Sequence, residues 1–288
     1  MKDNFYKGGQ FLGASPEYDV ANVVIYGAPM DYTVSYRPGA RFGPEKIRNV
    51  SVALEEYSPY RDRSLDEINF YDAGDLVLPF GNVDKSLQMI YETTKMIYED
   101  KKFPIMLGGE HLVSLPAIQA AYEYFKNLKV IHLDAHTDLR NDYEGEVNSH
   151  ATVIKKVADL VDASNVFQLG IRSGTREEFA YGKMNTNLYF NRLIEPLDEV
   201  VEKCAANPVY ITLDIDVLDP AFAPGTGTPE PGGVSFRELL YAFDKFNKLN
   251  VIGFDLVEVA PPYDHADITS IVAAKIVREA LLGFAKKI

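Results

Sequence analysis

The chain has 288 residues, a formal net charge of −13 and a single cysteine, Cys204. The cysteine count excludes an internal disulfide and a zinc site built from several cysteines. The acidity argues against a nucleic-acid-binding protein. Hydrophobic residues make up 47% of the chain and charged residues 25%, proportions that are typical of a soluble globular protein.

We expect neither a secretory signal nor a membrane span. The first residues include Lys2, Asp3 and Lys7 and contain no continuous apolar run. No uninterrupted apolar run in the chain approaches the roughly 18 residues that span a bilayer. Together with the single cysteine, these features favour a cytoplasmic protein that has no membrane partner.

Short apolar runs alternate with longer segments of helical periodicity along the chain. The runs at 22–26, 68–71, 103–107, 130–133, 166–169, 188–190, 209–213 and 251–254 predict strands, and the segments at 85–98, 115–126, 152–160, 235–246 and 268–284 predict helices. Continuous Val/Ile/Leu strands separated by helices are typical of a parallel sheet that is covered on both faces. We therefore predict one α/β domain over residues 1–288, a three-layer α/β/α fold with a mostly parallel sheet of about eight strands.

Polar residues of the kinds that bind metals or take part in catalysis follow four of these strands. They are Gly-Gly-Glu-His at 108–111, Asp-Ala-His-Thr-Asp at 134–138, Asp-Ile-Asp at 214–216, and Glu258. The carboxyl ends of parallel strands lie at one edge of a sheet, where ligands bind. The sequence therefore predicts that these residues converge in one crevice.

Histidine and aspartate in this combination predict a metal site. Carboxylates mixed with imidazole suit Mn²⁺ or a similar divalent ion, and the number of ligands is enough for two ions. A lone histidine is more often structural than a ligand, but His136 lies between two aspartates at i±2. His132, inside a strand, is interpreted as a core residue or as a partner of a ligand. His265 has no ligand-like neighbours.

The motifs at 108–111, 134–138 and 214–220, together with Ser-His at 149–150 and Glu258, resemble in order those of the ureohydrolases, the arginase/agmatinase superfamily of manganese enzymes. The resemblance covers the chain from about residue 27 to its C-terminus. It implies an arginase-like fold, two Mn²⁺ per chain and a homo-oligomer, either a trimer or a hexamer. It also implies an amidinohydrolase that acts on a linear carbon–nitrogen bond of a guanidino group.

The resemblance also assigns residues to roles. One ion would be held by His111, Asp134, Asp138 and Asp214, and the second by His136, Asp134, Asp214 and Asp216. Asp138 would transfer a proton, while His150 and Glu258 would bind the substrate and take part in catalysis. Two such ions can share and ionise one water molecule, which then attacks the guanidinium carbon. The chain departs from the family pattern at Glu110, where many members have Asp, and at Ala151, where Gly is common.

Two loops resemble those of the agmatine-hydrolysing members, namely 36–44 and the turn-rich segment 224–233. The segment between Asp138 and His150 is acidic, with Asp142, Glu144 and Glu146. Such a lining would repel a carboxylate and accept a primary ammonium group. This favours agmatine as the substrate, with putrescine (a precursor for polyamine biosynthesis) and urea as products, although Arg140 leaves a carboxylate-ended substrate open.

Three alternatives remain open from the sequence. The first is another ureohydrolase, such as guanidinobutyrase, arginase or formimidoylglutamase, which would share the metal centre. The second is a metal-binding regulatory or scaffold protein that has lost its activity. The third is a zinc deacetylase of related fold, which usually needs one ion and fewer carboxylates, so that the manganese content would discriminate between them.

Overall fold

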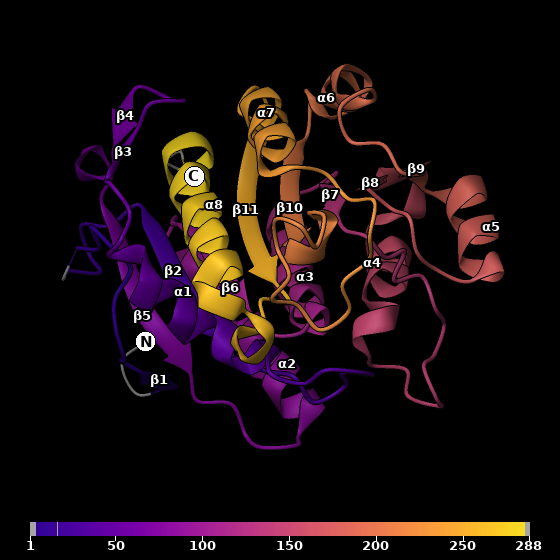
Figure 1. Cartoon of the computed structure of the whole chain (residues 1–288), viewed down its shortest axis with the longest axis horizontal. Coiled ribbons are helices and arrows are strands. Elements are labelled where there is room, and N and C mark those ends of the chain that lie inside the picture. Colours follow the sequence, from indigo (N-terminus) through magenta and orange to yellow (C-terminus); the bar gives the residue numbers. More distant parts are fainter. Residues whose placement is uncertain (1–3, 16, 286–288) are drawn as a thin grey trace.

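The computed structural model describes residues 4–15 and 17–285. Its main sheet has nine strands in the order β1-β5-β2-β6-β11-β10-β7-β8-β9 (Figure 1). These strands are β1 Phe5–Tyr6, β2 Val23–Ala28, β5 Phe70–Leu76, β6 Phe103–Gly108, β7 Lys129–Leu133, β8 Val166–Leu169, β9 Asn187–Tyr189, β10 Pro208–Asp214 and β11 Asn250–Val257. All pairs are parallel except β1 with β5. A separate hairpin pairs β3 (Tyr57–Ser58) with β4 (Arg63–Ser64).

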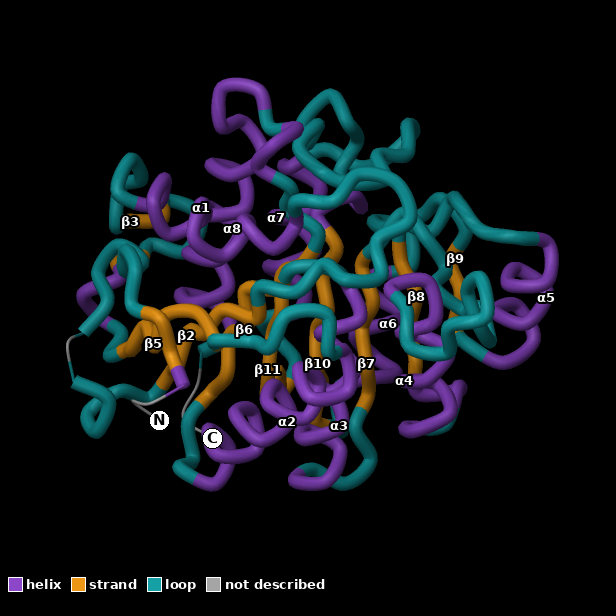
Figure 2. The backbone as a smooth tube through the Cα atoms, turned by 90° about the horizontal axis from the view of Figure 1, so that it is seen from below, coloured by secondary structure: helices purple, strands orange, loops and turns teal. Residues whose placement is uncertain are grey.

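Helices cover both faces of the sheet, so the predicted three layers are confirmed (Figure 2). The helices are α1 Gly43–Ser51, α2 Val83–Glu99, α3 Ser114–Tyr124, α4 Val153–Val161, α5 Arg176–Asn185, α6 Leu197–Cys204, α7 Phe236–Phe246 and α8 Ile268–Phe284. Residues of α1, α6, α7 and α8 share one apolar core with the sheet, and residues of α2, α3 and α4 share the other. Helix α5 packs beside β9 at the sheet edge.

The alternation of side chains along the strands builds these two cores. In β10, Val209, Ile211 and Leu213 belong to the core under α7 and α8, while Tyr210 belongs to the core on the opposite face. Every residue of β2 and β6 is buried. Both faces of the strands are therefore apolar, as expected for a parallel sheet between two helical layers.

All eight predicted strands are present, and the sheet adds β1 as an antiparallel edge. The five predicted helices correspond to α2, α3, α4, α7 and α8. Helices α5 and α6 were not predicted. In α5 only Glu178 and Gly182 are buried, so this helix has no apolar stripe that periodicity could detect. Among the described residues, no helix combines the length and apolar character needed to cross a membrane.

The topology has one consequence for the site. The four strands that lead into the polar motifs are β6, β11, β10 and β7, and these are consecutive neighbours in the middle of the sheet. They run parallel, so their carboxyl ends lie side by side at one edge. The sheet order thus brings together residues that are separated by as many as about 150 positions in the sequence.

Candidate metal centre

Histidine and aspartate side chains meet at the carboxyl ends of β6, β7 and β10. Nδ1 of His111 lies 2.9 Å from Oδ2 of Asp134, 3.4 Å from Oδ2 of Asp138 and 3.5 Å from Oδ2 of Asp214. Nδ1 of His136 lies 2.9 Å from Oδ2 of Asp216 and 3.6 Å from Oδ1 of Asp134. The predicted ligands therefore form two groups that share Asp134.

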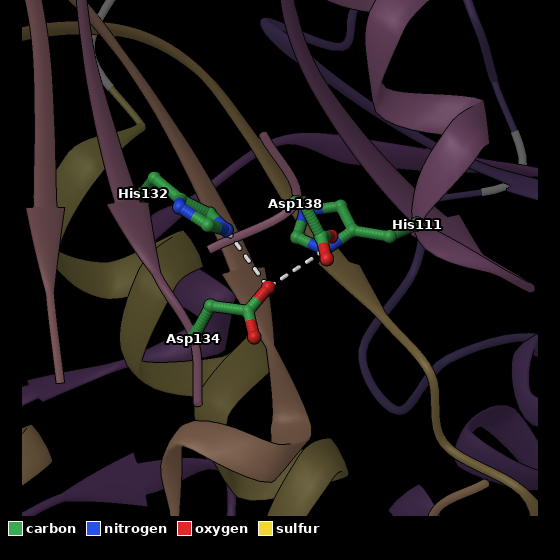
Figure 3. A group of neighbouring side chains, drawn as sticks. All are labelled: His111, His132, Asp134 and Asp138. Atoms are coloured by element: carbon green, nitrogen blue, oxygen red, sulfur yellow. Dashed lines mark hydrogen bonds and ion pairs between the residues drawn. The ribbon is translucent and has the colours of Figure 1, made fainter. Parts of the chain in front are cut away.

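Figure 3 shows how Asp134 lies between His132 and His111, with Asp138 beside the His111 ring. Ligand-type atoms of these four residues lie within 4.8 Å of one another, and atoms of Asp134, His136 and Asp216 form a second such group. His132 donates from Nε2 to Oδ2 of Asp134 at 2.8 Å and accepts at Nδ1 from Gln168 at 3.2 Å. Both of its ring nitrogens are thus engaged, and His132 orients Asp134, in agreement with its interpretation from the sequence.

The orientation of His111 is fixed from behind. Its Nε2 lies 2.9 Å from Oγ1 of Thr212, and that hydroxyl donates to Oδ1 of Asp255 at 2.6 Å. Since the single hydroxyl proton of Thr212 is used on Asp255, Nε2 of His111 carries the proton that it donates. Nδ1 then faces the three carboxylates, which is the orientation of a histidine that binds a metal through Nδ1.

Backbone donors hold the aspartates from the other side. Oδ1 of Asp214 accepts from the amide of Asp216 at 2.8 Å, and Oδ1 of Asp216 accepts from the amide of Ala135 at 3.0 Å. Each aspartate therefore directs its second oxygen into the cluster. Asp138 has a φ of 50°, and its carbonyl accepts from the amides of Ile154 and Lys155 in the first turn of α4.

The donor set fits divalent cations. Among the described residues, Nδ1 of His111 and Oδ2 of Asp216 are buried and make no hydrogen bond, although each lies 2.9 Å from an atom of the other residue type. Burial by itself would lower the pKa of His111, but Asp134, Asp138 and Asp214 raise it well above its usual value. Burial, followed by repulsion from Asp216 and Asp134, raises the pKa of Asp214 well above its usual value. In the metal-free protein these carboxylates hold a proton on Nδ1 of His111. A divalent cation bound in place of that proton would stabilise the crowded carboxylates.

Glu258 approaches the cluster from β11. Its φ is 64°, and its amide donates to the carbonyl of Gly109 at 2.8 Å. Its Oε1 accepts from the amide of His111 at 2.7 Å. Burial, and then the charge of Glu110, raises the pKa of Glu258 to about 8. Left-handed backbone at a residue other than glycine is uncommon and is concentrated at functional sites.

One pocket opens onto this cluster, with a volume of about 290 Å³. Its walls include His111, His136, Asp138, His150, Asp214 and Glu258. Asp134 and Asp216 lie beneath the pocket and are almost fully buried. Asp134 contacts His111, and Asp216 contacts His136. The structure therefore brings all eight predicted site residues together, whereas His265 is not among the lining residues.

Several pocket residues were not predicted as part of the site. Ser35, Tyr143, Ser173, Thr175, Glu178 and Thr228 line the walls. Most of them lie in loops with no periodicity to mark them. Glu178 had a local signal, because Thr175 and Glu178 form a capping box at the start of α5. Asp255 does not line the pocket but lies behind His111, where it accepts from Thr212. Its signal was its place as an acidic residue inside an apolar strand.

Comparisons with known proteins identify the family of the chain. The sequence model of the arginase family matches residues 21–283. Agmatinase of Bacillus cereus is 55% identical over 287 residues, covering 99% of each chain, and agmatinase of Bacillus subtilis is 54% identical over 288 residues, again covering 99% of each. The crystal structure of agmatine ureohydrolase of Thermoplasma volcanium has a TM-score of 0.86 at 31% identity and covers 97% of this chain and 95% of that one. The chain therefore belongs to the arginase family, as the motifs predicted.

Proposed function

We propose that this enzyme hydrolyses agmatine to putrescine and urea. Its membership of the arginase family makes it a hydrolase that acts on a guanidino carbon–nitrogen bond. The finer substrate assignment is supported by the Bacillus agmatinases, which are more than half identical over almost the whole chain. We also propose that the chain is one domain, that it assembles into a trimer or hexamer in the cytoplasm, and that its product supplies polyamine biosynthesis. These last proposals rest on the sequence and its resemblance to the family.

The proposed cofactor is a pair of Mn²⁺ ions. His111, Asp134, Asp138 and Asp214 would hold one ion, and His136, Asp134, Asp214 and Asp216 would hold the other. The observation that carries this proposal is the position of Asp134, whose Oδ2 faces His111 and whose Oδ1 faces His136. When bound, two divalent ions would lower the pKa of a water molecule, which is the chemistry that hydrolysis of a guanidinium group at neutral pH requires.

The chain's own residues bind the substrate cation. A guanidinium forms charge-assisted hydrogen bonds with a carboxylate, and Glu258 supplies one at the pocket wall. The amide of His111 fixes its Oε1, so that Oε2 remains for the substrate. The surrounding aspartates add negative charge, which favours a cationic substrate over a neutral one.

Two residues are proposed to move protons. Asp138 has one oxygen, Oδ2, 3.4 Å from Nδ1 of His111, and its other oxygen would accept a proton and pass it to the departing amine. Burial lowers the pKa of His150, which supports a neutral imidazole near pH 7 that can accept and return a proton.

The test compares urea release from agmatine, arginine and 4-guanidinobutanoate, using protein loaded with manganese and protein treated with EDTA. We expect kcat/KM for agmatine to exceed that for the other two by at least about tenfold, a difference of ~1.4 kcal/mol in transition-state stabilisation. EDTA treatment should remove the activity, and added Mn²⁺ should restore it. A clear preference for arginine or 4-guanidinobutanoate would overturn the substrate assignment and favour another ureohydrolase.

A further inference from the structure

The side chain of Glu110 forms hydrogen bonds with the loop that follows β2. Glu110 lies two residues after the end of β6 and is fully buried. Its amide donates to the carbonyl of Met30 at 2.7 Å. Its Oε2 accepts from the amide of Thr33 at 2.8 Å and from Oγ1 of Thr33 at 2.9 Å. One carboxylate oxygen therefore takes both donors of a residue in the loop after β2.

Thr33 in turn contacts His150. The amide of His150 donates to Oγ1 of Thr33 at 3.0 Å. A threonine hydroxyl has one proton and accepts through its lone pairs. Because its proton is donated to Glu110, Oγ1 is oriented to accept from His150. Three segments that are remote in sequence are joined by this relay, namely residues 110, 33 and 150.

The side chain of His150 has weaker contacts than its backbone. Its Nε2 lies 3.3 Å from Oγ of Ser35, and its Nδ1 lies 3.3 Å from Oγ of Ser149. The ring of Tyr143 lies edge-on at a centroid distance of 5.7 Å. These separations are at the long end for hydrogen bonds between uncharged groups. Of these hydrogen bonds, the one from the amide of His150 to Thr33 is therefore the shortest.

We propose that Thr33 and Glu110 are positioning residues that set His150 against the substrate pocket. This inference rests on the proposed role of His150 in binding and protonation. The relay starts at Glu110, one residue before His111, so it ties the position of His150 to the strand end that carries a proposed metal ligand. The length of glutamate matters here, because aspartate would withdraw the carboxylate from Thr33 by about 1.5 Å, one carbon–carbon bond.

The experiment uses Thr33→Val, which keeps the shape but removes the hydroxyl, and Thr33→Ser, which restores it. We expect Thr33→Val to raise KM for agmatine by about tenfold, the effect of one lost hydrogen bond to a charged network. Manganese content should stay equal to that of the parent protein, and Thr33→Ser should stay within about twofold of it. Glu110→Asp should reproduce the effect of Thr33→Val, and the double variant should lose little more.

A matched control separates positioning from loss of stability. Thr94 in α2 is buried, and its Oγ1 contacts the carbonyl of Ile90 and the hydroxyl of Tyr26, outside the pocket. Thr94→Val should lower the melting temperature and leave KM for agmatine unchanged. A rise in KM as large in Thr94→Val as in Thr33→Val would overturn the inference.

A double-mutant cycle that combines Thr33→Val with His150→Ala shows whether Thr33 affects KM through His150. If Thr33 acts through His150, Thr33→Val should cost nothing further in a His150→Ala background. If His150→Ala loses activity while Thr33→Val keeps parental kinetics, Thr33 does not position His150. The proposed function would still stand. Additive losses would refute the inference as well.

The effect of Thr33 on His150 can also be measured by NMR, without an activity assay. The ring resonance of His150, identified by its disappearance in His150→Ala, should shift in Thr33→Val and return to its parental position in Thr33→Ser. An unchanged resonance in Thr33→Val would overturn the inference. If the parent protein released no urea from agmatine, the proposed function would fail, and this resonance would still decide whether Thr33 positions His150.

Discussion

Oδ2 of Asp134 lies 2.9 Å from Nδ1 of His111, at the point where β7 ends beside the motif that follows β6. The other oxygen of Asp134 lies 3.6 Å from Nδ1 of His136. One carboxylate thus faces both histidines, while His132 orients it from behind. A carboxylate in this position suits a ligand that two cations share. The first test is therefore to remove the charge of Asp134.

Asp134→Asn should reduce both manganese content and urea release. Asparagine keeps the shape but replaces one carboxylate oxygen with an amide group that cannot bind a cation through its nitrogen. We expect urea release from agmatine to fall by at least about 100-fold, beyond the usual effect of changing a group that only orients a ligand. Metal analysis of the purified protein and a urea assay would measure this. Asp159→Asn, on the exposed side of α4, is the matched control and should change neither the manganese content nor the urea release. Near-normal turnover in Asp134→Asn would show that Asp134 is not part of the metal centre.

Glu258→Gln should keep the metal and weaken substrate binding. The amide oxygen can still accept from the amide of His111, so the local fold is retained. A bound guanidinium would favour the ionised form of Glu258, and glutamine cannot supply that charge. We therefore expect KM for agmatine to rise by about 10- to 100-fold, as for a lost hydrogen bond between charged groups. Steady-state kinetics and metal analysis would test this against Glu92→Gln, an exposed change in α2. Parental KM and kcat in Glu258→Gln would exclude Glu258 from the substrate site.

The sequence predicted the centre of this molecule better than its periphery, and the reason is physical. The strands at 103–107, 130–133, 209–213 and 251–254 are apolar on both faces, so they had to lie inside the sheet, and the polar residues after them had to share one edge. The topology then made these strands direct neighbours. Ligand-type residues at strand ends were therefore predictable from chain order and polarity alone.

Loops and short edge elements carried no comparable signal. Strand β1 has two residues, and its pairing with β5 depends on a contact across some 70 positions of the sequence. Thr33 lies in a loop, and its bonds to Glu110 and His150 exist only once three segments have folded together. Arg140 was visible as a charge, but its partner Glu178 could not be read from the sequence.

Stability of the metal-free protein should fall as pH rises from about 5 to 8. Burial and the neighbouring Glu110 raise the pKa of Glu258 to about 8, and burial raises the pKa of Glu110 to about 7. The unfolded carboxyl groups titrate near pH 4.3. Between these values the folded state holds more protons than the unfolded state, so deprotonation with rising pH favours unfolding. His111 acts in the same direction above its usual pKa, because its pKa is raised in the folded protein.

Thermal melts in EDTA across this pH range would measure the slope, and melts with Mn²⁺ provide the comparison. Bound cations favour deprotonated ligands, so manganese should stabilise the protein more at pH 8 than at pH 5. Glu258→Gln should flatten the slope in EDTA, since it removes one of the titrating groups. A melting temperature in EDTA that rises from pH 5 to pH 8 would contradict the assignment of these raised pKa values.

Arg140→Gln should discriminate between an ammonium-ended and a carboxylate-ended substrate. Arg140 is the only lysine or arginine among the described residues that line the pocket. Its Nε lies 3.5 Å from Oε2 of Glu178, and its guanidinium lies 4.9 Å from the centre of the Tyr143 ring. These two partners already engage it, and a cation at the pocket wall does not attract the ammonium end of agmatine. Its removal should therefore leave kcat/KM for agmatine within about fivefold, the range expected for a partly exposed ion pair.

A residue that bound a substrate carboxylate would behave in the opposite way. Arg140→Gln would then abolish the turnover of 4-guanidinobutanoate, and the parent protein would prefer that compound to agmatine. Parallel kinetics with both compounds measure this, with Arg176→Gln at the exposed start of α5 as the control for loss of one positive charge. A fall of more than about fivefold for agmatine at an unchanged melting temperature would show that Arg140 contributes directly to the reaction, because the loss of a partly exposed ion pair does not account for an effect of that size.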